Sequence, residues 1–368
     1  MKILFLAIDV SSRHGGIQRF NQRVLRVLGE LTAQGHQVRA ISSRDVDHEV
    51  GGVPVRGAGG NKRKALLWAA GTILRWQPDV LLLGHVLMTP TAVAARLLAP
   101  RATSLLFVHG YEVWDDPGLS VQPEWVRRAT RRGVHRVISV SDHTAGRMRT
   151  AFKLGDKPID LLPNALDLDA DGDAAAPAPD APQRDPRQIL TVSRMDEWGK
   201  GVDCMIRALP HVVAAIGPVR YVIAGSGKLQ PDHERIADEC GVRQYVTFAG
   251  RVSDAELDRL YRTSALFALP SRKEGFGIVY LEAWKHGMPV ICGNRDAAPE
   301  VVDDGVNGLV VDPNDPTTLA EATLRLLRDP AAAARMAQAG HEKLHREYGH
   351  ARFAERLRDL LAAATANR

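Results

Sequence analysis

The segment from Leu269 to Glu282, LPSRKEGFGIVYLE, carries the most informative group of chemically active residues in the chain. An apolar strand pattern ends near Leu269, and a helical pattern begins near Gly277 after a glycine-containing loop. Free N–H groups and the dipole at a helix start attract anions such as phosphate. Glu274 and Glu282 would repel a bare phosphate, but carboxylates accept paired hydrogen bonds from vicinal hydroxyls. The pattern therefore favours a diphosphate with a polyol on each side.

The glutamate spacing alone also fits a surface residue and an ordinary helical residue, so this interpretation needs further support. Two cations provide that support. Arg194 and Lys200 follow the first apolar strand of the second half of the chain. Open parallel sheets bind ligands at the carboxyl ends of their strands. There, the planar fork of an arginine and the point charge of a lysine can neutralise a diphosphate. Solvated loop cations are the alternative interpretation.

The first half has a glycine pair and a histidine at comparable places. Gly15 and Gly16 follow the first strand and open the first helix, where backbone amides can approach a phosphate. His109 stands at the end of another strand, where it can hydrogen-bond a sugar hydroxyl or polarise a carbonyl. Each signal is weak alone, since Gly-Gly turns are common and a lone histidine is more often structural.

Short apolar strands alternate with amphipathic helices in both halves, which is typical of α/β domains with helices on both faces of a parallel sheet. The predicted strands are Ile3–Ile8, Gln37–Ile41, Val80–Leu83, Ser104–Val108, Val137–Val140, Ile189–Val192, Arg220–Ala224, Tyr245–Phe248, Ala265–Leu269, Val290–Cys292 and Leu309–Val311. The predicted helices are Ile17–Gln34, Lys64–Trp76, Val202–Ala214, Asp254–Thr263, Ile278–Lys285, Pro316–Leu327 and Ala351–Ala364. Four prolines, the last of them Pro186, interrupt the pattern and predict a linker over 167–187.

Composition narrows the class of protein. The apolar content of 45% and the charged content of 25% are ordinary for a globular protein, and no apolar run reaches the roughly 18 residues of a membrane span. The three cysteines, Cys204, Cys240 and Cys292, have no metal-ligand spacing and fit buried thiols of a cytoplasmic protein. We find no cluster of ligating residues, so we expect neither a metal nor another cofactor.

The charge is unevenly distributed. Residues 1–165 hold 23 Lys and Arg against 13 Asp and Glu, a formal net charge of +10, and the rest of the chain has −5. A basic first half fits an anionic membrane surface or an anionic acceptor, with solvated helix faces as the alternative. Nucleic acid is disfavoured, because the arginine run from Arg127 to Arg132 has no interleaved aromatic residues.

Together, these motifs resemble the family 4 retaining glycosyltransferases, which have the GT-B fold. The resemblance covers nearly the whole chain, and its sharpest piece is Glu274 to Gly277 followed by Leu281 to Ala283. The other motifs that carry it are Gly15-Gly16, His109-Gly110, Val140-Ser141, Pro163-Asn164, Ser193-Arg194, Lys200-Gly201, Ala224 to Gly227, Phe248 to Arg251 and Pro270-Ser271.

The resemblance implies roles for the matching positions. Arg194 and Lys200 would hold the donor diphosphate, Glu274 would contact the donor sugar, and His109 would lie near that sugar. Glu282 would bind the ribose of the nucleotide, and the loop at 250–252 would contact the base. The complete donor-binding set outside the four catalytic positions is Gly16, Gly225, Arg251, Val252, Gly275, Phe276, Gly277, Ile278 and Glu282.

The resemblance also implies an architecture of two Rossmann-like αβα domains that face each other across a cleft. We predict an acceptor domain at 1–166, the linker at 167–187, a nucleotide-sugar domain at 188–345 and a helix at 346–368 that crosses back to the first domain. Transfer would retain the sugar configuration by front-face attack, with a donor phosphate oxygen taking the acceptor proton and no metal involved.

The expected function is transfer of a mannose-type or glucose-type sugar from a nucleotide-diphosphate sugar to a glycan or lipid-linked acceptor, in cell-surface polysaccharide or glycolipid synthesis. The expected location is cytoplasmic, with peripheral attachment to the inner face of the membrane left open. Two alternatives are a noncatalytic nucleotide-sugar sensor and an epimerase of the same fold. Donor identity stays open, because Trp198 lengthens the Arg194–Lys200 loop and Ala297-Ala298 replaces a glycine-containing turn.

Overall fold

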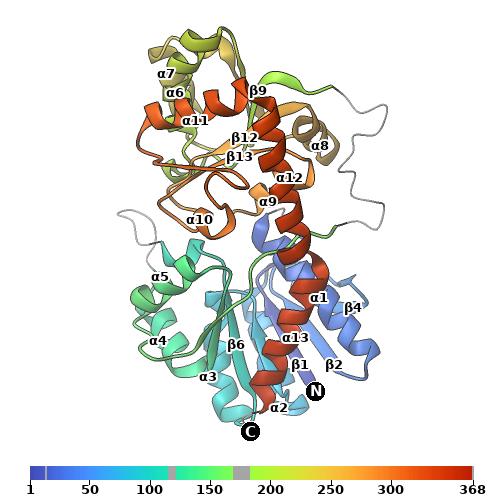
Figure 1. The fold of residues 1–368 in the computed structure, drawn as a ribbon. Coiled ribbons are helices and arrows are strands. Elements are labelled where there is room, and N and C mark those ends of the chain that lie inside the picture. The colour runs from blue at the N-terminus through green and yellow to red at the C-terminus, as the bar shows by residue number, and fades with distance from the viewer. Residues whose placement is uncertain (13–14, 115–121, 169–182, 367–368) are drawn as a thin grey trace. The chain divides into compact units, whose positions relative to one another are not determined.

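The computed structural model describes residues 1–12, 15–114, 122–168 and 183–366. The chain forms two compact units (Figure 1): unit 1 contains Met1–Asn164 and His350–Arg368, and unit 2 contains Ala165–Gly349. The predicted domain boundaries at 166, 187 and 345 stay predictions. Most of the predicted linker, residues 169–182, lies outside the described residues.

Unit 1 is built on an eight-stranded sheet in the order β3-β4-β2-β1-β5-β6-β7-β8. Its strand pairs are parallel except for the hairpin of β3 and β4. The central strands are buried on both faces, which explains why they are continuous apolar runs and not alternating ones. The strands are β1 Lys2–Ala7, β2 Gln37–Ser42, β3 His48–Val50, β4 Val53–Gly57, β5 Val80–Leu83, β6 Thr103–Val108, β7 Arg136–Ser139 and β8 Ile159–Leu161.

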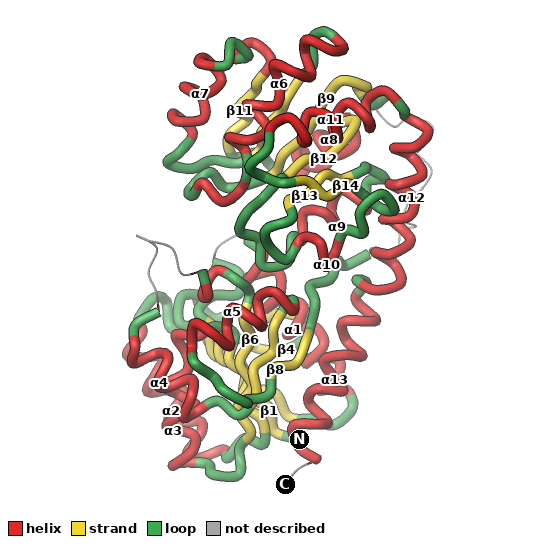
Figure 2. The backbone as a smooth tube through the Cα atoms, turned by 60° about the vertical axis from the view of Figure 1, so that its left-hand side comes forward, coloured by secondary structure: helices red, strands yellow, loops and turns green. Residues whose placement is uncertain are grey.

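Helices cover both faces of this sheet. Figure 2 shows α2, α3 and α4 on one side and α1 and α13 on the other. The helices are α1 Gly16–Ala33, α2 Lys62–Trp76, α3 Thr89–Leu98, α4 Glu124–Gly133, α5 Asp142–Phe152 and α13 His350–Ala366. The last helix, α13, is held on α1 by two contacts to the Glu30 carboxylate, one from His350 at 2.8 Å and one from Arg358 at 2.5 Å.

Unit 2 is built on a six-stranded, fully parallel sheet in the order β11-β10-β9-β12-β13-β14. Helices α6, α7 and α11 contribute to the main apolar core of this unit, around Met205, Tyr221 and Ile236. The strands are β9 Asp185–Val192, β10 Arg220–Ala224, β11 Val246–Gly250, β12 Ser264–Leu269, β13 Val290–Gly293 and β14 Leu309–Val311. The helices are α6 Val202–Ile216, α7 Gln230–Glu239, α8 Asp254–Thr263, α9 Ile278–Lys285, α10 Ala298–Val301, α11 Pro316–Arg328 and α12 Pro330–Glu347.

Several local features differ from the sequence-based expectation, among them β8, α7 and α12, which were not predicted. Strand β9 begins at Asp185, so Pro186 does not end regular structure but lies at the start of a strand, where a missing N–H is tolerated. The β3–β4 hairpin was not predicted, because its short strands are partly exposed and have no apolar run.

Candidate active site

The predicted donor-site residues of unit 2 follow the carboxyl ends of adjacent parallel strands. Arg194 follows β9, Gly225 follows β10, Arg251 follows β11 and Glu274 follows β12. Because all these strands are parallel, their carboxyl ends lie at one edge of the sheet, where ligands of such sheets bind. The loops also bond to one another, for example from the Gly225 N–H to the Gly250 carbonyl at 2.8 Å.

Lys200 and Glu274 form an ion pair at this edge. The Lys200 Nζ lies 2.8 Å from Glu274 Oε2 and also donates to the Lys273 carbonyl at 3.1 Å. Both side chains are about four-fifths buried, with exposed fractions of 19% and 20%. Burial lowers the pKa of Lys200, but Glu274 and more distant carboxylates outweigh it and raise the pKa above its ordinary value. The lysine is therefore a fixed cation at this edge.

Backbone contacts between two loops bring this pair together. The Arg272 N–H donates to the Gly199 carbonyl at 2.7 Å, and the Arg272 guanidinium bonds Asp203 at the start of α6. Gly201 has a φ of +73°, and a Cβ there would lie 1.9 Å from the Pro270 carbonyl oxygen. Only glycine allows this approach, so the 194–201 loop packs tightly against the loop that bears Glu274.

Arg194 extends from the same edge. Its side chain is 75% exposed and makes a long contact of 3.9 Å with Asp196. Arg251 is exposed as well, and Val252 is partly exposed. Because its side chain is largely exposed, the Arg194 guanidinium can reach an anionic ligand.

The start of α9 has the backbone conformation that the glycine motif predicts. Gly277 has a φ of +91°, and a Cβ there would lie 2.3 Å from the Tyr280 ring. The Phe276 side chain is buried against Tyr348, with ring centroids 5.6 Å apart, so only its backbone is available for a ligand. Ile278 is the first residue of α9 and is partly exposed.

Glu282 is the fifth residue of α9 and lies on its second turn. Its Oε2 accepts a hydrogen bond of 2.9 Å from the phenol of Tyr261, a buried residue of α8. Tyr261 in turn stacks on His286, with centroids 5.1 Å apart. The carboxylate of Glu282 is thus oriented by a neighbouring helix, which sequence reasoning did not predict.

A second carboxylate near Glu274 was also missed. Asp296 follows β13 and is only 6% exposed. Its Oδ2 accepts hydrogen bonds from the Glu274 N–H at 2.8 Å and from Ser271 Oγ at 2.6 Å. A carboxylate three residues after a parallel strand was the available signal, but its partners lie more than twenty residues away in the sequence.

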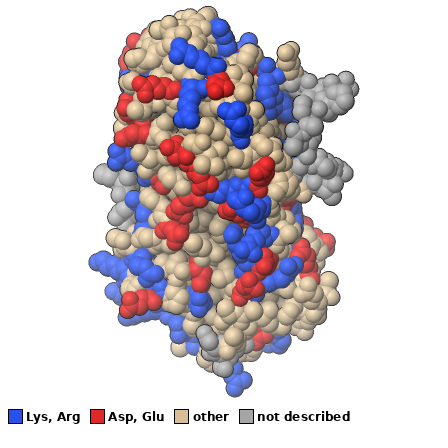
Figure 3. Space-filling model, viewed as in Figure 1, with Lys and Arg blue, Asp and Glu red and all other residues tan. Residues whose placement is uncertain are grey.

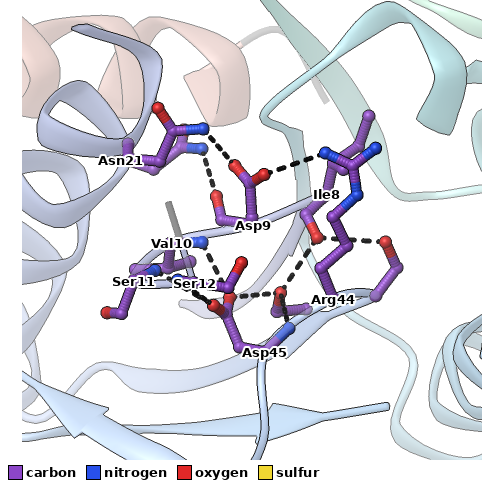
Figure 4. Close-up of polar contacts among 11 residues, drawn as sticks. Ile8, Asp9, Val10, Ser11, Ser12, Asn21, Arg44 and Asp45 are labelled. Atoms are coloured by element: carbon purple, nitrogen blue, oxygen red, sulfur yellow. Dashed lines mark hydrogen bonds and ion pairs between the residues drawn. The ribbon is translucent and has the colours of Figure 1, made fainter. Parts of the chain in front are cut away.

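In unit 1, the loop after β1 is anchored by an aspartate from the loop after β2 (Figure 4). The Asp45 carboxylate accepts three backbone N–H bonds, from Val10 at 2.7 Å, Ser11 at 3.1 Å and Ser12 at 2.6 Å. Burial raises the pKa of Asp45, but the Ser42 hydroxyl and these N–H groups outweigh it and hold the pKa below its ordinary value. Asp45 therefore acts as a buried anion that fixes the start of the loop.

Asp9 supports the other side of the same loop. Its carboxylate accepts from Gln18 Nε2 at 2.5 Å and from Arg44 at 3.2 Å, and its carbonyl accepts from Asn21 at 3.0 Å. The loop leads to Gly16, the first residue of α1, where a Cβ would meet no described atom within 4 Å. Residues 13–14 of the predicted glycine motif lie outside the described residues.

His109 directly follows β6, as predicted. Its backbone N–H donates to Glu112 at 3.1 Å, and its ring meets the Phe20 ring edge-on at 4.8 Å. Among the described residues neither ring nitrogen makes a hydrogen bond of ordinary geometry. Burial lowers the pKa of His109 more than Glu112 raises it, so the imidazole is neutral near pH 7.

Known protein families match the chain over both units. The model of glycosyl transferases group 1 matches residues 175–343, and that of glycosyltransferase family 4 matches residues 15–170. A GDP-mannose-dependent alpha-(1-6)-phosphatidylinositol monomannoside mannosyltransferase of Mycobacterium tuberculosis (strain H37Rv) is 30% identical over 395 residues, covering all of both chains. The chain is a family 4 glycosyltransferase. The predicted class of enzyme, a retaining glycosyltransferase, is thereby confirmed.

Other relatives of this glycosyltransferase agree on class and fold. The namesake mannosyltransferase of Mycolicibacterium smegmatis is 35% identical over 264 residues, or 66% of each chain. Sucrose-phosphate synthase from Thermosynechococcus elongatus aligns over all of both chains with a TM-score of 0.78 at 19% identity. Anabaena HepE in complex with UDP-glucose aligns over 99% of this chain and all of its own, with a TM-score of 0.72 at 18% identity. The predicted GT-B fold is confirmed.

The predicted site residues of this glycosyltransferase fall in both units. Unit 2 brings Lys200 and Glu274 into contact and sets Arg194 and Glu282 on neighbouring elements of the same sheet edge. Gly225 has a φ of +135°, and its Cβ would lie 1.9 Å from the Ser193 carbonyl oxygen, so this glycine is required for loop packing. That Gly16 and His109 of unit 1 also meet the donor stays a prediction.

Proposed function

We propose that this glycosyltransferase moves mannose from GDP-mannose to a phosphatidylinositol mannoside or a related glycolipid. The observation that carries the proposal is the Lys200–Glu274 pair, which places a fixed cation and a carboxylate together at the ligand-binding edge of unit 2. Mannose and the lipid acceptor are favoured by the curated relative that matches the chain from end to end.

In this proposal each charged group binds a different part of the donor. Arg194 and Lys200 neutralise the diphosphate, the first by a planar fork and the second as a point charge. Glu274 accepts hydrogen bonds from the mannose hydroxyls, and Glu282, oriented by Tyr261, accepts them from the ribose. The amides from Gly275 to Ile278 add donors at the start of α9.

The proposed reaction needs charge stabilisation more than a protein nucleophile. The bond from the sugar C1 to the diphosphate oxygen breaks while a bond from C1 to the acceptor oxygen forms on the same face. The acceptor proton passes to an oxygen of the departing diphosphate. Lys200 and Arg194 stabilise the negative charge that develops there, and fixed charges of this kind supply the largest catalytic effect in many enzymes.

We further propose that unit 1 binds the anionic membrane that holds the acceptor. No helix in the described part of the chain is long and apolar enough to cross a bilayer. The face in Figure 3 mixes acidic and basic side chains, so it offers no uniform basic surface. Helix α2 differs: Leu66, Leu67 and Leu74 are 50%, 73% and 54% exposed, and the exposed charges beside them are basic. Exposed leucines with flanking cations are typical of interfacial helices.

Donor and acceptor are tested together. Purified protein is incubated with GDP-mannose or UDP-glucose, with and without vesicles that contain phosphatidylinositol mannoside, and free nucleoside diphosphate and the glycolipid product are measured. The proposal expects GDP-mannose to raise the melting temperature and to yield a lengthened glycolipid only with these vesicles. Stabilisation and turnover with UDP-glucose alone would contradict it.

Membrane binding is tested by co-sedimentation with vesicles of phosphatidylcholine with or without phosphatidylglycerol. We expect binding only to the anionic vesicles, weakening with salt because surface charges are screened. Leu67→Ser should reduce it, whereas Val306→Ser, at a residue of unit 2 that is 60% exposed, should not. Equal binding to neutral vesicles at all salt concentrations would contradict the proposed surface.

A further inference from the structure

Asp296 is a buried carboxylate that the proposed reaction does not use. It lies between β13 and α10, and neither composition nor motif marks it as a site residue. An ionised carboxylate with only 6% of its surface exposed is unfavourable unless hydrogen bonds and charges compensate for lost water. Its hydrogen bonds must therefore compensate for the lost water, and they also hold the neighbouring groups in place.

Within the described part of the chain, Asp296 accepts three hydrogen bonds, from the loop of Glu274 and from its own turn. Oδ2 accepts from the Glu274 N–H at 2.8 Å and from Ser271 Oγ at 2.6 Å, and Oδ1 accepts from the Ala298 N–H at 2.9 Å. In return, the Ala297 N–H donates to the Glu274 carbonyl at 3.2 Å. The backbone of Glu274 is thus held from both its N–H and its C=O side.

The side chain of Glu274 is held from the other direction by Lys200. A chain of contacts therefore runs from the Lys200 ammonium through Glu274 to the buried Asp296 carboxylate. The two contacts hold different parts of Glu274. Lys200 holds the carboxylate, and Asp296 holds the main chain from which that carboxylate projects.

We propose that Asp296, in its ionised form, is a positioning residue that holds Glu274 in the geometry required for sugar transfer. This inference rests on the proposed role of Glu274 as the carboxylate that contacts the donor sugar. In an ionised carboxylate, both oxygens act only as hydrogen-bond acceptors. Once protonated, it must donate one hydrogen, for example to Ser271 Oγ, and its hold on the Glu274 N–H weakens.

The surroundings make this protonation relevant near neutral pH. The pKa of Asp296 is raised from 3.8 to about 7, chiefly by burial and also by Glu274, while the Ser271 hydroxyl, the Ala298 N–H and Lys200 oppose the rise. Tyr280 and Cys292 also interact with Asp296, and burial raises the pKa of both, so they stay neutral in this range. Arg295, the preceding residue, is exposed, pairs with Asp312 and stays charged. Transfer should therefore increase as the pH rises through about 7.

Stability should change in the opposite direction. Because the pKa is higher in the folded protein, the native state binds more protons than the unfolded state between pH 3.8 and about 7. The stability contributed by this group therefore falls as the pH rises through that range. A residue that was merely structural would be expected to favour both folding and activity together.

The test compares Asp296→Asn with a matched control, Asp329→Asn. Asp329 is an exposed carboxylate that accepts the Ala332 N–H at 2.9 Å at the start of α12. Turnover of GDP-mannose with the acceptor vesicles is measured from pH 5.5 to 8.5. Below about pH 7, we expect the wild-type kcat to fall about tenfold for each unit by which the pH is lowered, as for one ionising group. This acidic part of the pH profile is called the acidic limb. In Asp296→Asn, kcat at pH 8 should be about tenfold lower, the donor KM should change little, and the acidic limb should disappear. Asp329→Asn should match the wild type.

A second variant keeps the test informative if Asp296→Asn does not fold. Ser271→Ala retains the carboxylate but removes a hydrogen bond that favours ionisation, so the limb should move to higher pH. Wild-type kcat and an unchanged limb in Asp296→Asn, or an unmoved limb in Ser271→Ala, would overturn the positioning role alone. Wild-type protein that neither binds nor turns over GDP-mannose would overturn the proposed donor, and with it the role of Glu274.

Discussion

The two units have similar sheets, yet they use charge differently at the carboxyl ends of their strands. In unit 2, Lys200 and Glu274 pair with each other at the ligand-binding edge, and Arg194 stays three-quarters exposed. In unit 1, the Asp45 carboxylate is buried in the backbone of the first loop, and Asp9 is paired with Arg44.

The difference suggests a division of labour. In the proposed site, Lys200 and Arg194 of unit 2 lie where a donor would bind, whereas Asp45 and Asp9 of unit 1 stabilise the loop that leads to Gly16. Substitutions at the edge of unit 2 should therefore reduce transfer strongly with modest loss of stability. Substitutions of the buried aspartate in unit 1 should do the reverse.

The largest effect is expected for Lys200→Ala. Removal of one preorganised charge from a developing anion typically costs about 10²–10³ in kcat, and we expect a loss of this size here. The melting temperature should fall only modestly, so the loss of kcat cannot be explained by unfolding. Turnover of GDP-mannose and thermal unfolding are measured on the same preparation.

The control for this variant is Arg235→Ala, which removes an exposed ion pair with Glu239 on α7. Such a pair contributes little to stability and lies outside the proposed site, so activity should not change. If Lys200→Ala kept activity within a few-fold of Arg235→Ala, the edge of unit 2 would lose its proposed role.

The next largest effect is expected for Asp45→Asn, on stability. The amide replaces one carboxylate oxygen with an NH₂ group, so N–H donors of the first loop lose an acceptor, at a cost of about 2–3 kcal/mol in the free energy of unfolding. The pKa of Asp45 is lowered in the folded protein. Its contribution is therefore complete above pH 3.8 and is lost as the pH falls through the folded pKa.

Urea unfolding at pH 7 and near pH 3 measures this difference. Asp47→Asn is the matched control, since that carboxylate is exposed and accepts a single N–H, from Gly57 at 2.8 Å. It should cost about 1 kcal/mol or less. A stability gap between wild type and Asp45→Asn that grew at low pH would show that the anion is not what holds the loop.

The sequence predicted those parts of both units that depend on local pattern. Buried strands such as Val80–Leu83 are visible as short apolar runs, and the glycine at position 277 indicates the start of α9. The roles of Asp45 and Asp296 could not be predicted in the same way. Each stands three residues after a parallel strand, but what its carboxylate binds depends on which distant loop packs beside it.

The same limit applies to the candidate site. The residue types of Lys200 and Glu274 suggested a shared ligand, but not that they contact each other before any ligand binds. Their contact requires Gly199, Gly201 and Pro270 to bring two loops together across more than seventy residues of sequence. Tyr261 behind Glu282 was missed for the same reason, because it comes from a neighbouring helix.

The smallest predicted effect tests whether unit 1 contributes to the donor site. A methyl group at Gly16 would meet no described atom within 4 Å, and the residue opens α1, so Gly16→Ala should leave stability unchanged or slightly increased. If the Gly16 amide approaches the donor diphosphate, the methyl group crowds the ligand, and the donor KM should rise about three- to tenfold. Gly146→Ala, in α5, is the matched control, because its methyl group also meets nothing within 4 Å. An equal donor KM in both variants would confine donor recognition to unit 2 and leave the glycine loop of unit 1 with a structural role.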